Sequence, residues 1–208
     1  TGVQEFMGLE FQVNEHVLIP RQDTETLVEL VLSEHKEKNI SLLDVCTGSG
    51  CIAISLAKLG GYTDVTALDL SEEALKVARS NGEKLLDQPV KFIKSDMFSA
   101  LNPEKQYNVI VSNPPYIPSQ VIEGLEPEVK DHEPRMALDG EPDGLKFYRI
   151  LAEEGKKYLK NGGSIYMEIG WDQAKDVTEI FEAMGFSGLR TVRDMAGNDR
   201  VVCARKEK

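Results

Sequence analysis

The sequence predicts an α/β protein with a doubly wound, mostly parallel sheet of seven strands, the last of them antiparallel, preceded by a short β-hairpin. Short apolar runs of strand length alternate with longer segments of helical periodicity, which is the pattern of a parallel sheet covered by helices on both faces. The last two strand-like runs have no helix between them. They are therefore expected to pair as an antiparallel hairpin at one edge of the sheet.

Bulk composition narrows the function classes. The 208 residues suit one large domain, and 41% hydrophobic with 28% charged residues is ordinary for a soluble protein. No apolar run approaches the ~20 residues that span a bilayer. The net charge of −11 argues against a nucleic-acid partner, because such proteins need cations to displace counterions from phosphates. Three cysteines without paired histidines argue against a zinc site and for a reducing cytoplasm.

The N-terminal part predicts a hairpin followed by a helix. Residues 3–19 alternate loosely between apolar and polar side chains and end at Pro20. We therefore divide the chain into a hairpin segment, residues 1–20, and a main domain, residues 21–208. Asp23 or Thr24 is expected to cap the first helix, whose inward positions are Leu27, Leu30 and Val31.

The remaining elements follow in strict alternation. Ser71 is expected to cap the third helix, and the glycines within 161–163 to stop the fourth. A long loop rich in proline and acidic residues separates the fourth parallel strand from that fourth helix. The expected strands are 40–46, 65–70, 90–94, 109–112, 164–169, 187–193 and 200–204, and the expected main-domain helices after the first are 51–60, the one after Ser71, 143–159 and 173–184.

A glycine-containing turn follows the first parallel strand and opens a helix. Gly48 and Gly50 allow a tight turn and close approach of a ligand to the backbone. Asp69 ends the next strand about 20 residues on, where a carboxylate accepts two ribose hydroxyls. This is the general dinucleotide fingerprint, so it leaves NAD(P), S-adenosylmethionine and a plain turn without ligand all open.

Three features favour S-adenosylmethionine. Asp44 precedes the glycines, where a carboxylate suits an ammonium better than a pyrophosphate. The third strand ends in Asp96, suited to an adenine amino group, with Met97 and Phe98 placed to cover the ring. Tyr116 and Phe6 are aromatic rings that are expected to face a sulfonium cation.

The chemistry is expected at Asn113, directly after the fourth parallel strand. Pro114 and Pro115 have no N–H to continue a ladder, and Pro114 holds Asn113 extended. The Asn113 side-chain oxygen and the Pro114 carbonyl then form two rigid acceptors, which is an arrangement for gripping an NH₂ group. The alternative is a Pro-Pro turn that only closes a strand.

Four segments together resemble the HemK/PrmC family, the S-adenosylmethionine-dependent methyltransferases of the glutamine side-chain nitrogen (N5) in peptide chain release factors. The likeness runs from about residue 5 to residue 205 and rests on Asn113-Pro114-Pro115-Tyr116, Asp44…Gly48-Ser49-Gly50, Ile19-Pro20-Arg21-Gln22-Asp23-Thr24-Glu25 and Glu133-Pro134…Ala137-Leu138. Gln22-Asp23 stands where the family commonly has Pro-Glu, and Met97 stands where some members carry tryptophan. Nothing in the chain matches the small helical domain with which family members usually begin.

The resemblance implies a Rossmann-like class I methyltransferase fold, S-adenosylmethionine as cofactor, release factors as partners, and a cytoplasmic location. It implies no metal. The catalytic group would be Asn113, Pro114, Pro115 and Tyr116, which hold the glutamine. The cofactor-binding residues would be Asp44, Cys46, Thr47, Gly48, Ser49, Gly50, Asp69, Leu70, Asp96, Met97, Phe98 and Asn113.

Amide chemistry sets the expected mechanism, since an amide nitrogen is a poor nucleophile. Two carbonyl acceptors would orient it and push electron density onto it, with no ionised base needed at the start. The loop beside this site carries eight acidic residues, which we interpret as favouring a basic protein substrate over a plain solvated face: Glu123, Glu126, Glu128, Asp131, Glu133, Asp139, Glu141 and Asp143.

Two other functions remain open from the sequence. The Asn-Pro-Pro-Tyr segment is shared with methyltransferases of adenine and guanine amino groups in nucleic acid, which the net charge of −11 disfavours. The chain is also compatible with a cofactor-binding module that has no activity.

Overall fold

The computed structural model describes residues 2–130 and 132–208. A two-stranded antiparallel sheet of β1 (Val3–Phe6) and β2 (Leu9–Gln12) precedes the main domain. The main sheet consists of β3 (Ser41–Val45), β4 (Asp64–Asp69), β5 (Lys91–Lys94), β6 (Tyr107–Ser112), β7 (Leu159–Glu168), β8 (Ser187–Arg193) and β9 (Asp199–Arg205). The helices are α1 (Gln22–Glu34), α2 (Cys51–Gly60), α3 (Glu72–Leu85), α7 (Lys146–Tyr158), α8 (Ala174–Ala183) and the short α4 (Ser119–Ile122), α5 (Pro127–Lys130) and α6 (Arg135–Leu138).

The sheet topology confirms the predicted fold class. The seven strands lie in the order β5-β4-β3-β6-β7-β9-β8, and only β9 runs against its neighbours. The chain proceeds outward from β3 through β4 to β5 and then crosses back to β6, on the other side of β3. Ligands of open α/β sheets bind beyond the carboxyl ends of the strands at such a switch point.

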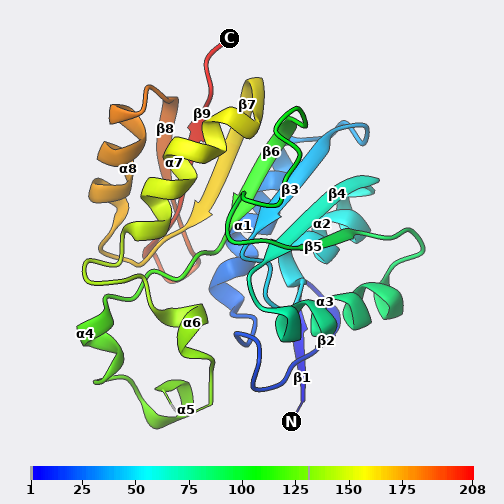
Figure 1. Ribbon diagram of the computed structural model, residues 1–208, viewed down its shortest axis with the longest axis vertical. Helices are drawn as coiled ribbons and strands as arrows, with labels where there is room; N and C mark the ends of the chain where they lie inside the picture. Colours follow the sequence, from blue (N-terminus) through cyan, green and yellow to red (C-terminus); the bar gives the residue numbers. More distant parts are fainter. Residues whose placement is uncertain (1, 131) are drawn as a thin grey trace.

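Helices cover both faces of the sheet, as Figure 1 shows. Side chains of α1 and α2, among them Leu27 and Ile54, pack on one face, and side chains of α7 and α8, among them Leu151 and Phe181, pack on the other. The central strand β3 is buried along its whole length, as expected for a strand covered on both sides. Among the described residues, no helix combines the length and apolar character that crossing a membrane requires.

The N-terminal hairpin belongs to the same core. Phe6 and Phe11 are fully buried, lie edge to face with ring centroids 6.1 Å apart, and join the cluster of α1 and α2. The prediction that Phe6 faces a cofactor is therefore wrong, because the hairpin uses this ring to attach itself to the domain.

Two predicted helix starts differ from the structure, while the Ser71 cap is confirmed by its hydrogen bond from the Ala74 N–H (3.1 Å). Helix α1 begins at Gln22, with Arg21 at the N-cap and no side-chain cap, so neither Asp23 nor Thr24 caps it. Helix α7 begins at Lys146 rather than at residue 143, since the Asp143 carboxylate accepts the Leu145 N–H in a turn before the helix.

The glycines of 161–163 do not terminate a helix. Helix α7 ends at Tyr158 and β7 begins at once with Leu159. The glycines lie inside β7, where the pairing with β6 shifts register between Tyr107 and Val109. An irregular strand thus replaces the predicted helix stop, as glycine in a strand often indicates.

The long loop between β6 and α7 is more ordered than predicted. It contains α4, α5 and α6, and Ile117 forms a parallel bridge with Asp139. Ser119 Oγ donates to Asp139 Oδ1 (2.6 Å), which closes the base of the excursion. Figure 1 shows this segment beyond the carboxyl edge of the sheet, on the side to which β7 points.

Candidate active site

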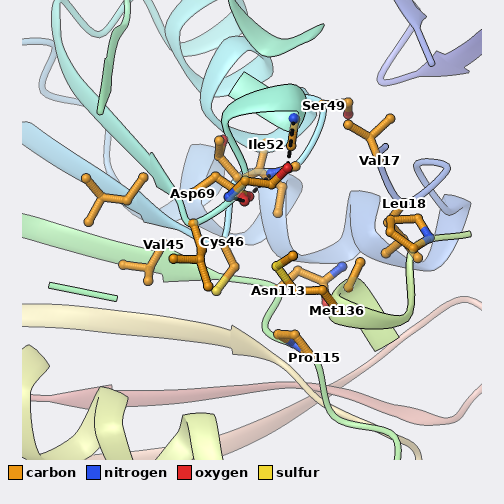
Figure 2. A pocket seen from close by; sticks show the side chains of 18 of the residues that line it. Val17, Leu18, Val45, Cys46, Ser49, Ile52, Asp69, Asn113, Pro115 and Met136 are labelled. Carbon is orange, nitrogen blue, oxygen red and sulfur yellow. Dashed lines mark hydrogen bonds between the residues drawn. The ribbon is translucent and has the colours of Figure 1, made fainter. Parts of the chain in front are cut away.

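A cavity of about 1030 Å³, open solvent at its mouth included, lies at the carboxyl edge of the sheet beside the switch point. Its walls come from the ends of β3, β4 and β5, from the loop after β6, and from two segments remote in sequence, residues 16–24 and 134–137. Figure 2 shows Cys46 and Asp69 facing Asn113 and Pro115, with Val17, Leu18 and Met136 around the opening.

The turn after β3 is built to expose backbone to the cavity. Gly48 has φ +56°, and a Cβ there would meet nothing within 4 Å, so the glycine leaves free space against the cavity. Gly50 has φ +82° and forms the N-cap of α2. A Cβ on Gly50 would lie 2.9 Å from Ile54 Cδ1, so this glycine serves packing and does not line the cavity.

Asp69 links this turn to the end of β4. Its Oδ2 accepts the Gly48 N–H (2.8 Å) and its Oδ1 accepts the Ser71 N–H (2.9 Å). Burial raises the pKa of this carboxyl, which these hydrogen bonds oppose. Each oxygen keeps a further lone pair, so the carboxylate can still accept hydroxyl groups from the cavity. The exposed Leu70 follows it on the wall.

Asp44 is fully buried behind the wall rather than on it. Its Oδ2 accepts from the Thr47 hydroxyl (2.6 Å), whereas its Oδ1 has no hydrogen-bond partner among the described residues. Burial raises the pKa of Asp44 to about 7. Ser49 lines the cavity, and its buried hydroxyl likewise has no hydrogen-bond partner within the described part of the chain. These orphaned groups fit a ligand that brings a cation and hydroxyl groups.

The end of β5 contributes an acid and a thioether. Asp96 and Met97 line the cavity, and Met97 Sδ lies 3.8 Å from Cys46 Sγ, a second lining residue. Phe98 does not reach the cavity, contrary to prediction. It stacks on Tyr158, with centroids 5.2 Å apart and planes 6° apart, because the chain after Met97 turns into the core on the α7 side.

Asn113 and Pro115 form the opposite wall. The Ser112 hydroxyl donates to the Val45 carbonyl (2.7 Å), which fixes the end of β6 against β3. Among the described residues, no hydrogen bond engages the Asn113 side chain. Pro114 is buried behind this wall, so only its carbonyl is a candidate contact.

Tyr116 turns away from the cavity, so the prediction that its ring faces the cofactor is wrong. Its hydroxyl donates to Glu168 Oε1 (3.1 Å) and its carbonyl accepts from Gln173 Nε2 (2.9 Å). Glu168 and Gln173 flank the end of β7, and both are buried. Tyr116 therefore anchors the Asn-Pro-Pro turn to the neighbouring strand.

Two of the wall segments, residues 16–24 and 134–137, contain none of the predicted catalytic or cofactor-binding residues. Arg21 lines the cavity and pairs with Glu133 Oε1 (2.5 Å), whose side chain is only 1% exposed. This contact holds the α6 segment, with Met136 and Ala137 on the wall, against the N-terminal segment. Both segments belong to the family resemblance, which is their signal in the sequence.

The acidic loop carries less free charge than its composition indicates. Most of its carboxylates form ion pairs within the protein. Glu123 pairs with Lys130 and Arg135, Asp139 with the same Arg135, Glu141 with Lys146, Asp143 with Arg149 and Glu133 with Arg21. Asp131 and the Glu128 side chain lie outside the described part of the chain. The structure thus weakens the charge argument for a basic substrate.

Within residues 2–130 and 132–208, no group of His, Cys, Asp and Glu side chains is arranged to hold a metal ion. Cys203 is buried in the core, whereas Cys46 and Cys51 reach the cavity wall. Burial raises the pKa of the Cys51 thiol to about 12, so this group stays protonated and unreactive.

Comparison with known proteins identifies the family. Residues 22–124 match the model of the methyltransferase small domain. The release factor glutamine methyltransferase of Fusobacterium nucleatum is 45% identical over 99% of this chain, and that of Clostridium botulinum is 43% identical, also over 99%. The chain spans 58% of the Fusobacterium protein and 74% of the Clostridium protein.

A solved structure agrees with these relatives. The release factor-specific protein-(glutamine-N5) methyltransferase of Alicyclobacillus acidocaldarius is 32% identical, with a TM-score of 0.55, over 95% of this chain and 100% of that one. The identity and the coverage exceed what a shared fold alone produces. The chain therefore belongs to the family of release factor glutamine methyltransferases.

Proposed function

We propose that this chain transfers a methyl group from S-adenosylmethionine to the side-chain amide nitrogen of the glutamine in the Gly-Gly-Gln motif of peptide chain release factors. The observation that carries the proposal is the unengaged Asn113 amide on a cavity wall that faces the glycine turn and Asp69. We further assign residues 21–208 as the methyltransferase domain and residues 1–20 as a hairpin segment that closes one wall.

The cofactor would be held by the turn after β3 and by the ends of β4 and β5. Asp69 would accept ribose hydroxyls, Asp96 would accept an adenine amino group, and the Asp44 carboxylate would attract the ammonium. Gly48 leaves the space, and Met97 would cover the ring. When bound, S-adenosylmethionine supplies a methyl group on a positively charged sulfur.

The chain's own contribution to the reaction is orientation. Asn113 Oδ1 and the Pro114 carbonyl would each accept one N–H of the glutamine amide. Two acceptors in the amide plane fix the nitrogen and raise its electron density, and because both are held on a rigid turn they need no reorganisation. The apolar side chains of Val17, Leu18 and Met136 line the cavity and would shield the bound amide from water.

A cytoplasmic location fits the proposal, because three unpaired cysteines persist in a reducing compartment. The relatives are longer than this chain. The glutamine itself must still reach Asn113, whichever surfaces guide it there.

The test is mass spectrometry of a release factor incubated with the chain and isotopically labelled S-adenosylmethionine. Label on the glutamine of the Gly-Gly-Gln peptide supports the proposal, and label on RNA or DNA bases instead would replace it with amino-group methylation of nucleic acid. Cofactor binding with no turnover on either substrate would identify a binding module.

The variant Asn113→Ala is expected to lower the rate about 10²–10³-fold, the usual cost of one such hydrogen-bonding group, while cofactor affinity stays near wild type. Asn102→Ala is the matched control, since Asn102 lies in an exposed turn before β6, away from the cavity. A normal rate in Asn113→Ala would show that the amide is not gripped as proposed.

A further inference from the structure

Two buried polar side chains, Thr24 on the cavity wall and Glu168 behind it, are not used by the proposed mechanism. Thr24 lines the cavity with 2% of its surface exposed, and its hydroxyl has no hydrogen-bond partner among the described residues. Glu168 is also 2% exposed, and its Oε2 lacks a partner in the same part of the chain. Most buried polar atoms in proteins are hydrogen-bonded, so two unsatisfied oxygens at one site need an explanation.

The fold brings these two side chains together from distant segments. Thr24 lies in the first turn of α1, which packs against β7 and β9, and Glu168 is the last residue of β7. The Thr24 hydroxyl lies close enough to the Glu168 carboxyl to lower its pKa. The other carboxyl oxygen, Oε1, accepts the Tyr116 hydroxyl, so only Oε2 remains available.

The positive charge near Glu168 neutralises its carboxylate only in part. Burial raises its pKa, opposed by Thr24, Arg200 and Tyr116, while Asp23 raises it further. The Arg200 guanidinium is shared with Asp194 (3.1 Å) and Asp23 (3.5 Å). The remaining titratable groups that face this site are Tyr148, whose hydroxyl donates to the Glu168 carbonyl (2.7 Å), and Cys51.

Amide methylation must dispose of a proton. The nitrogen lone pair forms the new N–C bond while the electrons of the breaking S–C bond stay on sulfur. The nitrogen is then positively charged until one N–H proton leaves. The two carbonyl acceptors at Asn113 and Pro114 orient that N–H but are too weakly basic to keep the proton, so a stronger acceptor is needed after transfer.

We propose that Thr24 and Glu168 form the exit path for this proton. The Thr24 hydroxyl oxygen accepts the proton from the methylated nitrogen and passes its own hydrogen to Glu168 Oε2. The product amide and the cofactor sulfur are both left neutral, and Glu168 later returns its proton to solvent. Thr24 would touch the substrate as a catalytic residue, and Glu168 would act through it.

This inference rests on the proposed function, and the variants separate the two. Glu168→Gln keeps the shape and the Tyr116 hydrogen bond but cannot take up a proton. Its kcat is expected to fall about 10²-fold, a typical effect of losing a proton acceptor, with the KM for release factor and the affinity for S-adenosylmethionine unchanged. The kcat of Thr24→Val should fall by the same factor, whereas Thr24→Ser keeps the hydroxyl and should retain the wild-type kcat.

The double variant Glu168→Gln/Thr24→Val should be no slower than either single variant, because the two residues act as one unit. Ser55→Ala is the control: it removes an equally buried, unpartnered hydroxyl that is not on the cavity wall, and its rate should match wild type.

The pH dependence gives a second readout. The relay needs an ionised Glu168, so kcat should fall as pH decreases through its pKa, which burial places above the ordinary glutamate value. This acidic limb should vanish in Glu168→Gln. In the chain without cofactor, carbon NMR of the carboxyl should show a higher Glu168 pKa in Thr24→Val than in wild type, because the polar hydroxyl that lowers this pKa is replaced by a methyl group.

The outcomes are distinct. If the wild-type chain methylates no release factor, the proposed function fails. If the wild type is active and Thr24→Val or Glu168→Gln keeps its kcat, or loses efficiency only through KM, the relay is refuted while the function stands. An NMR titration in which Thr24→Val leaves the Glu168 pKa unchanged would likewise refute it.

Discussion

The two walls of the cavity are built in different ways. The cofactor wall comes from residues 45–49, 51–52, 68–71 and 95–97, which are ends of adjacent parallel strands and the turns directly after them. The acceptor wall combines residues 16–24, the loop after β6 and residues 134–137, with support from the end of β7. The sheet itself places the residues of the cofactor wall next to one another. The residues of the acceptor wall are brought together by individual side-chain contacts.

Substitutions in the two walls should therefore have different effects on stability, cofactor affinity and turnover. The cofactor wall rests on backbone conformation and on ladders of the central sheet, so altering it should cost folding stability or cofactor affinity. The acceptor wall rests on pairs such as Arg21 with Glu133, which lie 112 residues apart. Altering such a pair should change substrate handling and turnover while the domain stays folded.

The largest expected effect separates the two glycines of the turn after β3, of which Gly48 lines the cavity and Gly50 does not. Gly50→Ala places a Cβ 2.9 Å from Ile54 Cδ1 at φ +82°, and left-handed strain plus overpacking should lower the free energy of unfolding by about 2–4 kcal/mol. Gly48→Ala, at φ +56° with open space around it, should cost about 1–2 kcal/mol and weaken cofactor binding.

Chemical denaturation and calorimetric titration with S-adenosylmethionine measure both quantities. Equal stability of Gly50→Ala and Gly48→Ala would contradict the assignment of Gly50 to packing. Cofactor binding at full strength by Gly48→Ala would show that this glycine is not leaving room for a ligand.

The next effect is the pH dependence of Asp44. Its pKa is about 7 in the fold against an ordinary 3.8, so the folded state favours the protonated form. Its contribution to stability is therefore greatest below about pH 4 and is lost as pH rises towards 7. Cofactor affinity should change in the opposite sense, because an ammonium prefers the ionised carboxylate, and Kd should rise about tenfold per unit below pH 7.

Calorimetric titration between pH 5.5 and 8, repeated on Asp44→Asn, checks this prediction. The variant should bind more weakly at pH 8 and show a flat profile. A wild-type affinity that does not respond to pH would mean that Asp44 carries no charge that the cofactor recognises.

The smallest effect on global stability is expected at the acceptor wall. Arg21→Met leaves Glu133 buried without its cation, yet Arg21 is itself 42% exposed, so water screens the pair and the cost should be about 1 kcal/mol. Hydrogen exchange over residues 133–138 should accelerate, and the KM for release factor should rise.

Lys105→Met is the control, because Lys105 is as exposed as Arg21 but pairs with an exposed carboxylate, Asp64 (2.7 Å), at the other edge of the sheet. It should alter neither exchange in residues 133–138 nor KM. Unchanged exchange in Arg21→Met would show that α6 is held by its packing alone, and the distinction between the two walls would then weaken.

The cofactor wall was predicted from the sequence more fully than the acceptor wall. Gly48, Asp69 and Asp96 lie where the motif after each strand places them. Asn113 also reaches the cavity, because strand length and two prolines determine its backbone. The predictions that the rings of Phe98 and Tyr116 face the cofactor are wrong. The direction of each ring depends on a partner distant in sequence, Tyr158 for Phe98 and Glu168 for Tyr116.

What the sequence alone determined is the alternation of strands and helices and the chemistry placed at each strand end. These follow from periodicity and from the fixed dihedrals of glycine and proline, which act over a few residues. Only the tertiary structure decided that Thr24 meets Glu168 and that Arg21 meets Glu133. Such pairs form because separate elements are packed against one sheet, and no local preference along the chain encodes that distance.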